Sequence, residues 1–334
     1  MKLISSIFCI AFVVLTAAHA QVITTVAGNG TEGFCGDGGL ATSACLDGPM
    51  GVAVDATGNL YIADKNNMRI RKVSPSGIIT TVAGNGIGDF TGDVGRATDQ
   101  SLWFPVDVAV DSTGNLYIAD WQNNRIRKVD PKGSMVTVAG GGVCCGLGDG
   151  GPATRGTLNE PMAVVVDSVG NLYIADYRHN RVRRVGTNGR IETIAGTGAY
   201  GPAGDGGPAT AAKITFPQAV VVDAAGNVYI ASNERIRKVS PGGTIVAVAG
   251  GGTQTGEGVP ATTVQIYLND FVVDRHGDLY FVDYVVRIRL RKVSPDGIIT
   301  SIMEMPPGMT VRALDSAGNL YLTGPGNLVF KMTF

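Results

Sequence analysis

A ten-residue segment that recurs along the chain constrains the fold more than any other feature of the sequence. The first copy is DATGNLYIAD, and related segments begin at Asp55, Asp111, Asp167, Asp223, Asp274 and Asp315. Successive copies start 56, 56, 56, 51 and 41 residues apart. A self-similar period of this size is typical of a repeat architecture, in which each repeat packs against its neighbours. We therefore expect residues 21–334 to form one domain, although 334 residues would suffice for two.

Each full copy contains four short runs that suit β-strands. In the first copy they are residues 51–54, 59–63, 69–73 and 78–82, separated by the turn-rich segments DATG, DKNNM and SPSG. This alternation predicts a four-stranded antiparallel meander. The innermost runs, such as the VVV that precedes Asp167, are continuously apolar. That pattern is typical of a sheet buried on both faces, as the blades of a propeller are.

The two ends of the chain complement one another. VITTVAG at residues 22–28 matches the fourth-strand run IITTVAG at residues 78–84, whereas the last copy stops after its third run at residues 328–332. The N-terminal segment can therefore supply the missing fourth strand and leave no sheet edge open. We predict an all-β, six-bladed β-propeller of four-stranded antiparallel blades, with the ring closed by the N-terminal strand completing the last blade.

The repeat also resembles a known family. The pattern P-x-G-V-A-V-D, G-N-L-Y-I-A-D and N-x-R-I-R-K-V is present most fully at residues 49–73, 105–129 and 161–185, and it resembles the NHL repeat. The fourth copy departs from it at Ser232, and the sixth copy lacks the arginine run. The resemblance implies the fold but no single function, because NHL propellers include protein-binding ectodomains and RNA-binding modules, and neighbouring six-bladed families include lactonases and lyases.

Residues 1–20 differ from the repeats. Lys2 provides a positive start, residues 3–15 are mostly apolar, and Ala18 and Ala20 suit a cleavage site. This pattern predicts a signal peptide and a secreted or periplasmic mature chain from Gln21, without a membrane span; the alternative is a retained anchor helix. Asn29 begins a glycosylation sequon that matters only in a eukaryotic source.

Export would place the remaining cysteines in an oxidising compartment. We expect a disulfide between Cys35 and Cys45, which would close one local loop. Cys144 and Cys145 are adjacent, which is awkward for a bridge between them, so they either pair elsewhere or stay free. A catalytic dithiol is the alternative, but the chain has no Cys-x-x-Cys spacing.

Two series of aspartates repeat with the copies, and we interpret both as structural. The aspartate that begins each segment precedes a turn with glycine, where its carboxylate can accept backbone N–H groups. The second series ends the second strand and should pair with an arginine across the following turn. These expected pairs are Asp64 with Arg69, Asp120 with Arg125, Asp176 with Arg181 and Asp283 with Arg289.

The charge balance excludes one class of partner. The RIRKV runs could form a nucleic-acid surface, but the chain has 27 basic and 28 acidic residues, and the expected export also argues against it. We therefore predict no nucleic-acid partner.

Long glycine-rich inserts precede four of the first strands, and a shorter one precedes a fifth. These inserts should lie on the same face of the ring as the second turns, which favours that face for binding. Each insert contains one acid: Asp37, Asp93, Asp149, Asp205 or Glu257. One carboxylate is far fewer than the six to eight oxygens that calcium takes, so we interpret these acids as caps of tight turns, with Pro-Ala-Thr docked between blades. No cofactor is predicted, and calcium is the alternative.

Aromatic residues gather on the expected binding face. Trp103 and Phe104 precede a first strand, and Trp121, Tyr177 and Tyr284 follow the second-series aspartates. If exposed, these rings form a rim suited to a protein, peptide or glycan; the alternative is that they are wedges packed between blades.

Charged residues are expected at the mouth of the central channel. Counting four residues back from each turn aspartate places Asp107 and Asp270 on the second and fifth blades, which are opposite in a ring of six. Arg312, from the sixth blade, lies one position further in. This group could orient a ligand or hold a cation, or Arg312 could simply neutralise one acid.

Two functions follow from these features. The favoured hypothesis is a secreted NHL-type propeller that binds a protein, peptide or glycan through the face with the long loops. The alternative is a metal-dependent hydrolase or lactonase of the gluconolactonase-like type, with Asp107 and Asp270 as metal ligands. Beyond residue 20 only His179 and His276 remain, so a three-histidine zinc centre is impossible and a lyase assignment is weakened.

Overall fold

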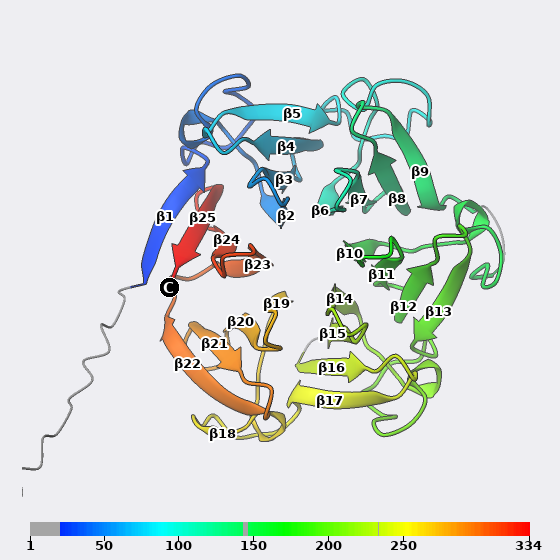
Figure 1. Cartoon of the computed structure of the whole chain (residues 1–334), viewed down its shortest axis with the longest axis vertical. Coiled ribbons are helices and arrows are strands. Elements are labelled where there is room, and N and C mark those ends of the chain that lie inside the picture. Colours follow the sequence, from blue (N-terminus) through cyan, green and yellow to red (C-terminus); the bar gives the residue numbers. More distant parts are fainter. Residues whose placement is uncertain (1–20, 143–145, 233) are drawn as a thin grey trace, which may run out of the picture.

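The structure is a computed structural model that describes residues 21–142, 146–232 and 234–334. Six antiparallel sheets surround a central axis, so the predicted six-bladed β-propeller is confirmed (Figure 1). The expected signal peptide and both Cys144 and Cys145 lie outside the described residues. Among the residues that are described, no helix has the length and apolar character needed to cross a membrane.

Each blade runs from an innermost first strand to an outermost fourth strand. The first blade contains β2 (Pro49–Val54), β3 (Leu60–Asp64), β4 (Arg69–Val73) and β5 (Ile79–Ala83). The second blade contains β6 (Pro105–Val110), β7 (Leu116–Asp120), β8 (Arg125–Val129) and β9 (Met135–Gly140). The third blade contains β10 (Pro161–Val166), β11 (Leu172–Asp176), β12 (Arg181–Val185) and β13 (Ile191–Ala195). The fourth blade contains β14 (Pro217–Val222), β15 (Val228–Ser232), β16 (Arg235–Val239) and β17 (Ile245–Gly250). The fifth blade contains β19 (Phe271–Val273), β20 (Leu279–Asp283), β21 (Arg289–Val293) and β22 (Ile298–Glu304), and the short strand β18 (Val259–Pro260) pairs with β22 at its outer edge. The sixth blade contains β23 (Thr310–Leu314), β24 (Leu320–Gly324), β25 (Leu328–Thr333) and β1 (Val22–Ala27).

The ring closes as the sequence predicts. β1 pairs antiparallel with β25, from Val22 opposite Thr333 to Ala27 opposite Val329. The sixth blade is thus built from both ends of the described chain (Figure 1). Apolar clusters that each combine residues of two neighbouring blades fill the spaces between sheets. The core is therefore a ring of inter-blade layers rather than one central cluster.

The repeated aspartate turn forms as expected. Asp55 Oδ1 accepts the backbone N–H groups of Thr57 and Asn59, both at 2.9 Å, and Gly58 has a φ of 83°. Burial raises the pKa of Asp55, but hydrogen bonds from Asn59 and Thr57 outweigh it and lower the pKa to about 2. The sequence analysis missed one contact: the Tyr61 hydroxyl donates to Asp55 Oδ2 at 3.2 Å and joins the turn to the second strand.

A buried arginine stands inside each of the first five blades, and its pairing differs from the prediction. In the first blade Arg71 Nη1 lies 3.2 Å from Asp64 Oδ2, and both side chains are buried. The predicted pairing of Asp64 with Arg69 is wrong, because Arg69 lies at the loop and donates to the backbone carbonyls of Asn67 and Asn85. Asp64 turns into the blade, where only the arginine two residues further along β4 reaches it.

The same correction applies to three other blades. The observed pairs are Asp120 with Arg127 at 3.4 Å, Asp176 with Arg183 at 3.3 Å and Asp283 with Arg291 at 3.1 Å, in place of Arg125, Arg181 and Arg289. In the fourth blade Ser232 replaces the aspartate, and the buried Arg237 pairs with Asp205 at 2.7 Å.

The acids of the inserts complete these networks. Asp37 Oδ1 lies 2.6 Å from Arg71 Nη2, and its Oδ2 accepts the N–H of Thr81 in the outer strand at 3.1 Å. The acids of the other inserts pair in the same way: Asp93 with Arg127, Asp149 with Arg183, Asp205 with Arg237 and Glu257 with Arg291. The interpretation of these acids as caps of tight turns is therefore wrong, since each pairs with an arginine and all except Asp205 also accept a hydrogen bond from the outer strand.

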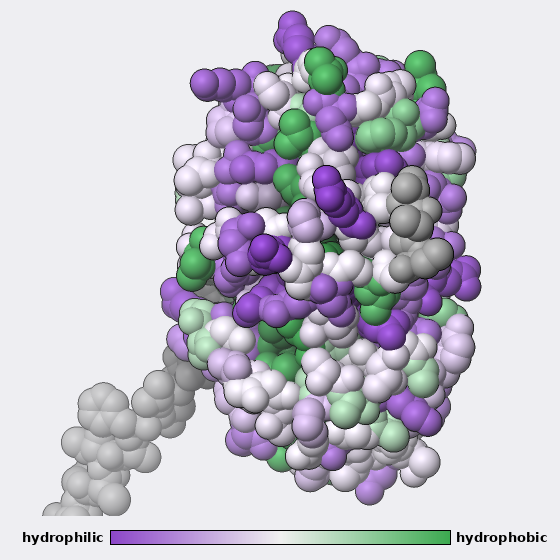
Figure 2. All heavy atoms as spheres, turned by 90° about the vertical axis from the view of Figure 1, so that its right-hand side faces the viewer, coloured by the Kyte–Doolittle hydropathy of each residue, from purple (hydrophilic) through white to green (hydrophobic). Residues whose placement is uncertain are grey.

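The inserts extend along the rim of the ring as well as over its face. Gly38 N donates to Ile79 O at 2.8 Å, and Ala41 N donates to Gly77 O at 2.8 Å, so the first insert runs beside the outer strand of the blade that follows it. Ala41 is buried between blades, as expected for Pro-Ala-Thr-like segments. On the side of the ring seen in Figure 2, hydrophobic residues are scattered among hydrophilic ones. The inserts thus cover the outer sheet edges, which would otherwise invite pairing with other chains.

The fourth blade provides a natural comparison for the buried arginines. Replacing Arg127 by methionine leaves the buried Asp120 and the part-exposed Asp93 without their cation, and we expect a loss of about 3–5 kcal/mol in the free energy of unfolding. Arg237→Met affects only Asp205, which is 31% exposed and keeps Arg235 at 3.8 Å, and it should cost roughly half as much. Urea denaturation of both variants measures the difference.

The surface Arg178, whose side chain is 50% exposed, provides the control. Arg178→Met should leave the free energy of unfolding nearly unchanged, because exposed ion pairs contribute little. Equal losses of stability for Arg127→Met and Arg237→Met would contradict the interpretation that the buried Asp120 makes the loss of Arg127 more costly.

Candidate functional site

One face of the ring gathers the second turns and the residues that precede the first strands. Backbone hydrogen bonds join these two sets: Asn66 N donates to Asp47 O at 3.0 Å, and Gln122 N donates to Trp103 O at 3.2 Å. We call this the loop face. It comprises residues 47–48, 65–68, 103–104, 121–124, 159–160, 177–180, 215–216, 267–270, 284–288 and 325–327.

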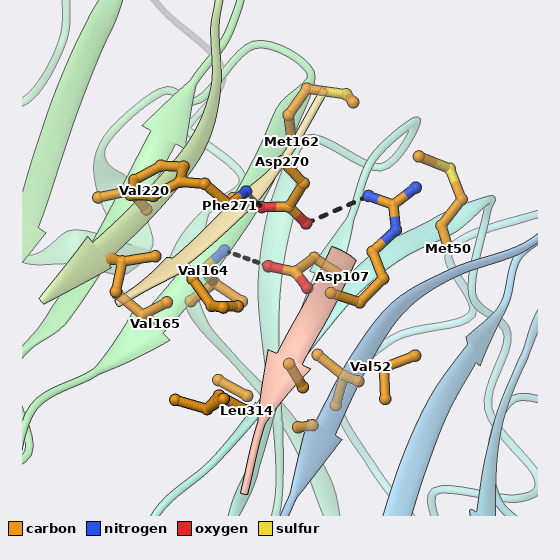
Figure 3. A pocket seen from close by; sticks show the side chains of 18 of the residues that line it. Met50, Val52, Asp107, Met162, Val164, Val165, Val220, Asp270, Phe271 and Leu314 are labelled. Atoms are coloured by element: carbon orange, nitrogen blue, oxygen red, sulfur yellow. Dashed lines mark hydrogen bonds and ion pairs between the residues drawn. The ribbon is translucent and has the colours of Figure 1, made fainter. Parts of the chain in front are cut away.

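A cavity of about 540 Å³ lies on the axis and is lined by the innermost strands (Figure 3). Most of its lining residues are apolar: valine and alanine predominate, and Met50 and Met162 are among them. The polar side chains of the lining are Asp107, Gln218, Asn269, Asp270 and Arg312. The structure therefore brings together the three charged residues that the sequence placed at the channel mouth.

Bulges in the innermost strands explain why polar side chains reach the cavity. In β23 the register shifts between Val311 and Ala313, which leaves Arg312 without a partner residue in β24. In β14 a similar shift lies between Pro217 and Ala219, with Gln218 in the bulge. A bulge redirects a side chain out of the regular alternation of a strand. Sequence register alone could place these residues near the mouth but could not show this redirection.

Asp270 is engaged by its neighbours. Its Oδ2 lies 3.2 Å from Arg312 Nη1, and its Oδ1 accepts the Phe271 N–H at 2.8 Å (Figure 3). Arg312 Nε also donates to Thr323 Oγ1 at 3.0 Å. Burial raises the pKa of Asp270 to about 6, against the opposing effects of Arg312 and the backbone N–H. The interpretation that Arg312 neutralises one acid fits this geometry.

The negative charge of Asp107 is less well compensated than that of Asp270. Its Oδ2 accepts the Val164 N–H at 2.9 Å, and its Oδ1 faces Gly51, where an added Cβ would lie only 2.4 Å away. Within the described part of the chain, no lysine, arginine or histidine forms an ion pair with Asp107. Burial, and then the negative charge of Asp270, raise the pKa of Asp107 to about 7.

Two exposed aromatic side chains stand at equivalent positions on the same two opposite blades. Trp103 is 39% exposed and Tyr267 is 46% exposed. The N–H of each donates to the aspartate that ends the second strand, Trp103 to Asp120 at 2.7 Å and Tyr267 to Asp283 at 3.1 Å. Sequence reasoning found Trp103 but missed Tyr267, although both precede a channel acid by three or four residues.

The other predicted aromatic residues are partly buried and pack against the ring. The rings of Trp121 and Phe104 lie 6.2 Å apart, and Tyr177 stacks on Phe216 of the next blade at 4.8 Å. These contacts correspond to the alternative in which aromatic residues are wedges.

Tyr284 lies deeper, close to the charged residues of the cavity. Its hydroxyl donates to the Met309 carbonyl and lies 2.9 Å from Thr310 Oγ1. Burial raises its pKa. Its ring contacts the exposed Tyr267 edge to face at 6.4 Å, so Tyr284 supports the rim from below.

The described residues contain no group of three or more His, Cys, Asp or Glu side chains that could hold a metal ion. At the channel mouth the two carboxylates are Asp107 and Asp270, and the second is bound to Arg312. His179 Nδ1 lies 2.9 Å from Asp176 Oδ2, which already serves the buried Arg183.

The predicted disulfide is present. Cys35 and Cys45 are bonded, with Cα atoms 4.8 Å apart, in the first insert. The Arg71 guanidinium donates to the backbone carbonyls of both cysteines at 3.3 Å. The crosslink thus holds the insert against the buried arginine of the first blade.

Six four-stranded sheets around a central channel define a six-bladed β-propeller. Residues 20–90 match the family model of the Teneurin NHL domain, and residues 102–129 match that of the NHL repeat. The chain is thus a six-bladed propeller, and these residues of it match NHL repeats. It is 34% identical to human Teneurin-1 over 236 residues, which cover 63% of this chain and 8% of that protein. The chain therefore corresponds to a small part of such relatives.

Solved structures share the fold at low sequence identity. A gluconolactonase from Xanthomonas campestris superposes with a TM-score of 0.61 at 15% identity, covering 93% of this chain and 88% of that one. An auxiliary nutrient binding protein from Bacteroides thetaiotaomicron gives a TM-score of 0.64 at 12% identity, covering 94% and 76%. At such identities the similarity concerns the fold alone.

The raised pKa of Asp107 predicts a pH-dependent stability. Because its pKa rises from 3.8 to about 7 on folding, the folded state binds more protons across this window, and the free energy of unfolding falls as the pH rises through it. Asp107→Asn removes the titrating carboxyl group and therefore this loss of stability at high pH. We expect it to raise the free energy of unfolding by about 2–4 kcal/mol at pH 8 and by less than about 1 kcal/mol at pH 4.5, as measured in urea.

Asp111 provides a control of opposite sign. Burial raises its pKa, but hydrogen bonds from Asn115 and Thr113 outweigh this and lower it. Asp111→Asn should therefore destabilise the protein at pH 8. A pH-independent effect of Asp107→Asn would contradict the assignment of a strained acid at the channel mouth.

Proposed function

We propose that this chain is an exported interaction module that binds a protein partner through the loop face. The observation that carries the proposal is the pair of exposed aromatic side chains, Trp103 and Tyr267, on opposite blades of the loop face, together with a central cavity that has charged lining residues. Exposed aromatic residues around a concave centre are typical of binding hot spots. The Cys35–Cys45 disulfide and the N-terminal apolar segment support export.

The metal-dependent lactonase remains the weaker candidate. The fold similarity to a gluconolactonase supports it only at the level of architecture. The channel mouth offers Asp107 and Asp270, and Arg312 already occupies the second. A binding role needs no further ligands and uses both the cavity and the aromatic rim.

The proposed function predicts a face-specific loss of binding. The mature chain is immobilised and exposed to the extracellular fraction of its source, and bound proteins are quantified by mass spectrometry. We expect Trp103→Ala combined with Tyr267→Ala to reduce capture of the specific partner at least about tenfold, as for truncation of hot-spot residues.

Val169→Ala provides the matched control, because Val169 is 73% exposed in the turn between β10 and β11 at the opposite end of the blade. It should leave capture of the same protein unchanged. The proposal is wrong if the capture of every protein falls equally in the Val169→Ala control and in the variant that lacks Trp103 and Tyr267. It is also wrong if the capture of no protein depends on Trp103 and Tyr267.

A further inference from the structure

We propose that the channel mouth binds the side-chain ammonium of a lysine that the protein partner presents. This inference rests on the proposed function for the source of the lysine, but the site can be tested alone. The site comprises Asp107, Asp270 and the side-chain carbonyl of Gln218 in the cavity, and Trp103 and Tyr267 belong to the loop face around it.

The charges of the lining favour a cation. Arg312 is the one cationic side chain of the cavity lining, and it is bound to Asp270 at 3.2 Å and to Thr323 at 3.0 Å. Asp107 has no such partner among the described residues, and its Oδ1 faces the bare backbone of Gly51. A cation that entered the cavity would therefore find a carboxylate without a counter-ion in a poorly solvated place, where charge pairing is strong.

A second acceptor points the same way. Gln218 Oε1 is buried and has no hydrogen-bond partner among the described residues, and Gln218 lines the same cavity. An ammonium group carries three donors and no acceptor, so it can donate to the Asp107 carboxylate and to the Gln218 side-chain carbonyl. Arg312, the cation that an anionic ligand would need, already shares its charge with Asp270.

The shape and the apolar wall favour an alkylammonium over a metal ion. The remaining lining consists of Met50, Met162 and many valine and alanine side chains, which can pack against the methylene groups of a lysine. A hard metal ion would need more oxygen ligands than the described residues supply. Trp103 and Tyr267 lie on the surrounding loop face, outside the cavity lining, where they can contact other parts of the partner.

The titration of Asp107 supports the charge argument. The charged groups that act on it are Asp270, before β19, and Arg312 in β23, whereas β2 and β10 face it with Gly51 and the Val164 N–H. Its pKa of about 7 means that a cation should bind better as the pH rises from 6 to 8, when the carboxylate loses its proton.

The test uses the mature chain with 13C-labelled methionine methyl groups and the probe Nα-acetyl-lysine N-methylamide. We expect saturable shifts of the Met50 and Met162 methyl signals, which line the cavity, and none of Met135 or Met332, which are buried elsewhere. Nα-acetyl-norleucine N-methylamide, which has no ammonium, should cause no shift. Equal shifts with both probes would overturn the proposal.

Two variants separate charge recognition from a structural effect. Asp107→Asn should weaken binding of the lysine probe about tenfold, while Arg312→Met, which frees Asp270, should strengthen it. A purely structural role would weaken binding in both. Unchanged Met135 and Met332 signals show that each variant is folded, and unchanged affinity in Asp107→Asn, or parallel losses in both variants, would overturn the assignment.

The outcome is independent of partner capture. Probe binding without any partner that depends on Trp103 and Tyr267 would leave the lysine site standing and remove the proposed protein interaction. Partner capture that depends on these aromatic residues, without probe binding, would leave the proposed protein interaction standing and remove the lysine site. A free amine that binds more tightly than the lysine amide, with capture unaffected by Asp107→Asn, would overturn the assignment of the ligand to a protein.

Discussion

The rest of the structure depends on the contacts of the arginine that is buried in each of the first five blades. Arg71 lies inside the first blade with no exposed side-chain surface, between Asp64 of the second strand and Asp37 of the insert. A buried guanidinium is costly unless several acceptors surround it. By meeting that need, the arginine ties together two strands, the insert and, through the insert, the edge of the blade. The glycine-rich inserts are therefore part of the scaffold, which explains why they recur with their acids.

Much of the fold could be predicted because the sequence pattern of one blade recurs several times along the chain. Six copies fix the number of blades, and the match between residues 22–28 and 78–84 fixes the closure, since a strand without a partner would leave an open edge. The pairing of acids and arginines could not be predicted correctly. Arg69 and Arg71 both point to the same side of β4, and sequence spacing does not show which one the carboxylate turns toward.

The site was only partly predictable for a related reason. The register of the innermost strands placed Asp107 and Asp270 at the mouth, because first strands repeat in every blade. Tyr267 was missed because it precedes the shortened strand β19, where the spacing to the turn aspartate changes. The bulge that aims Arg312 into the cavity has no signal in the sequence, since it arises from the pairing of β23 with β24.

The exceptional residue of this propeller is an acid that the scaffold does not neutralise. Among the described residues, the buried aspartates of the blades each have a cationic partner: Asp64, Asp120, Asp176 and Asp283 an arginine, and Asp278 the ammonium of Lys292. Asp107 has a backbone N–H and a glycine instead. The turn aspartates such as Asp55 have no cationic partner either, but they accept several hydrogen bonds instead. A proton can neutralise Asp107, whose pKa is about 7, or a cation can do so, and the cavity on which it borders is the route by which a ligand could bring that cation.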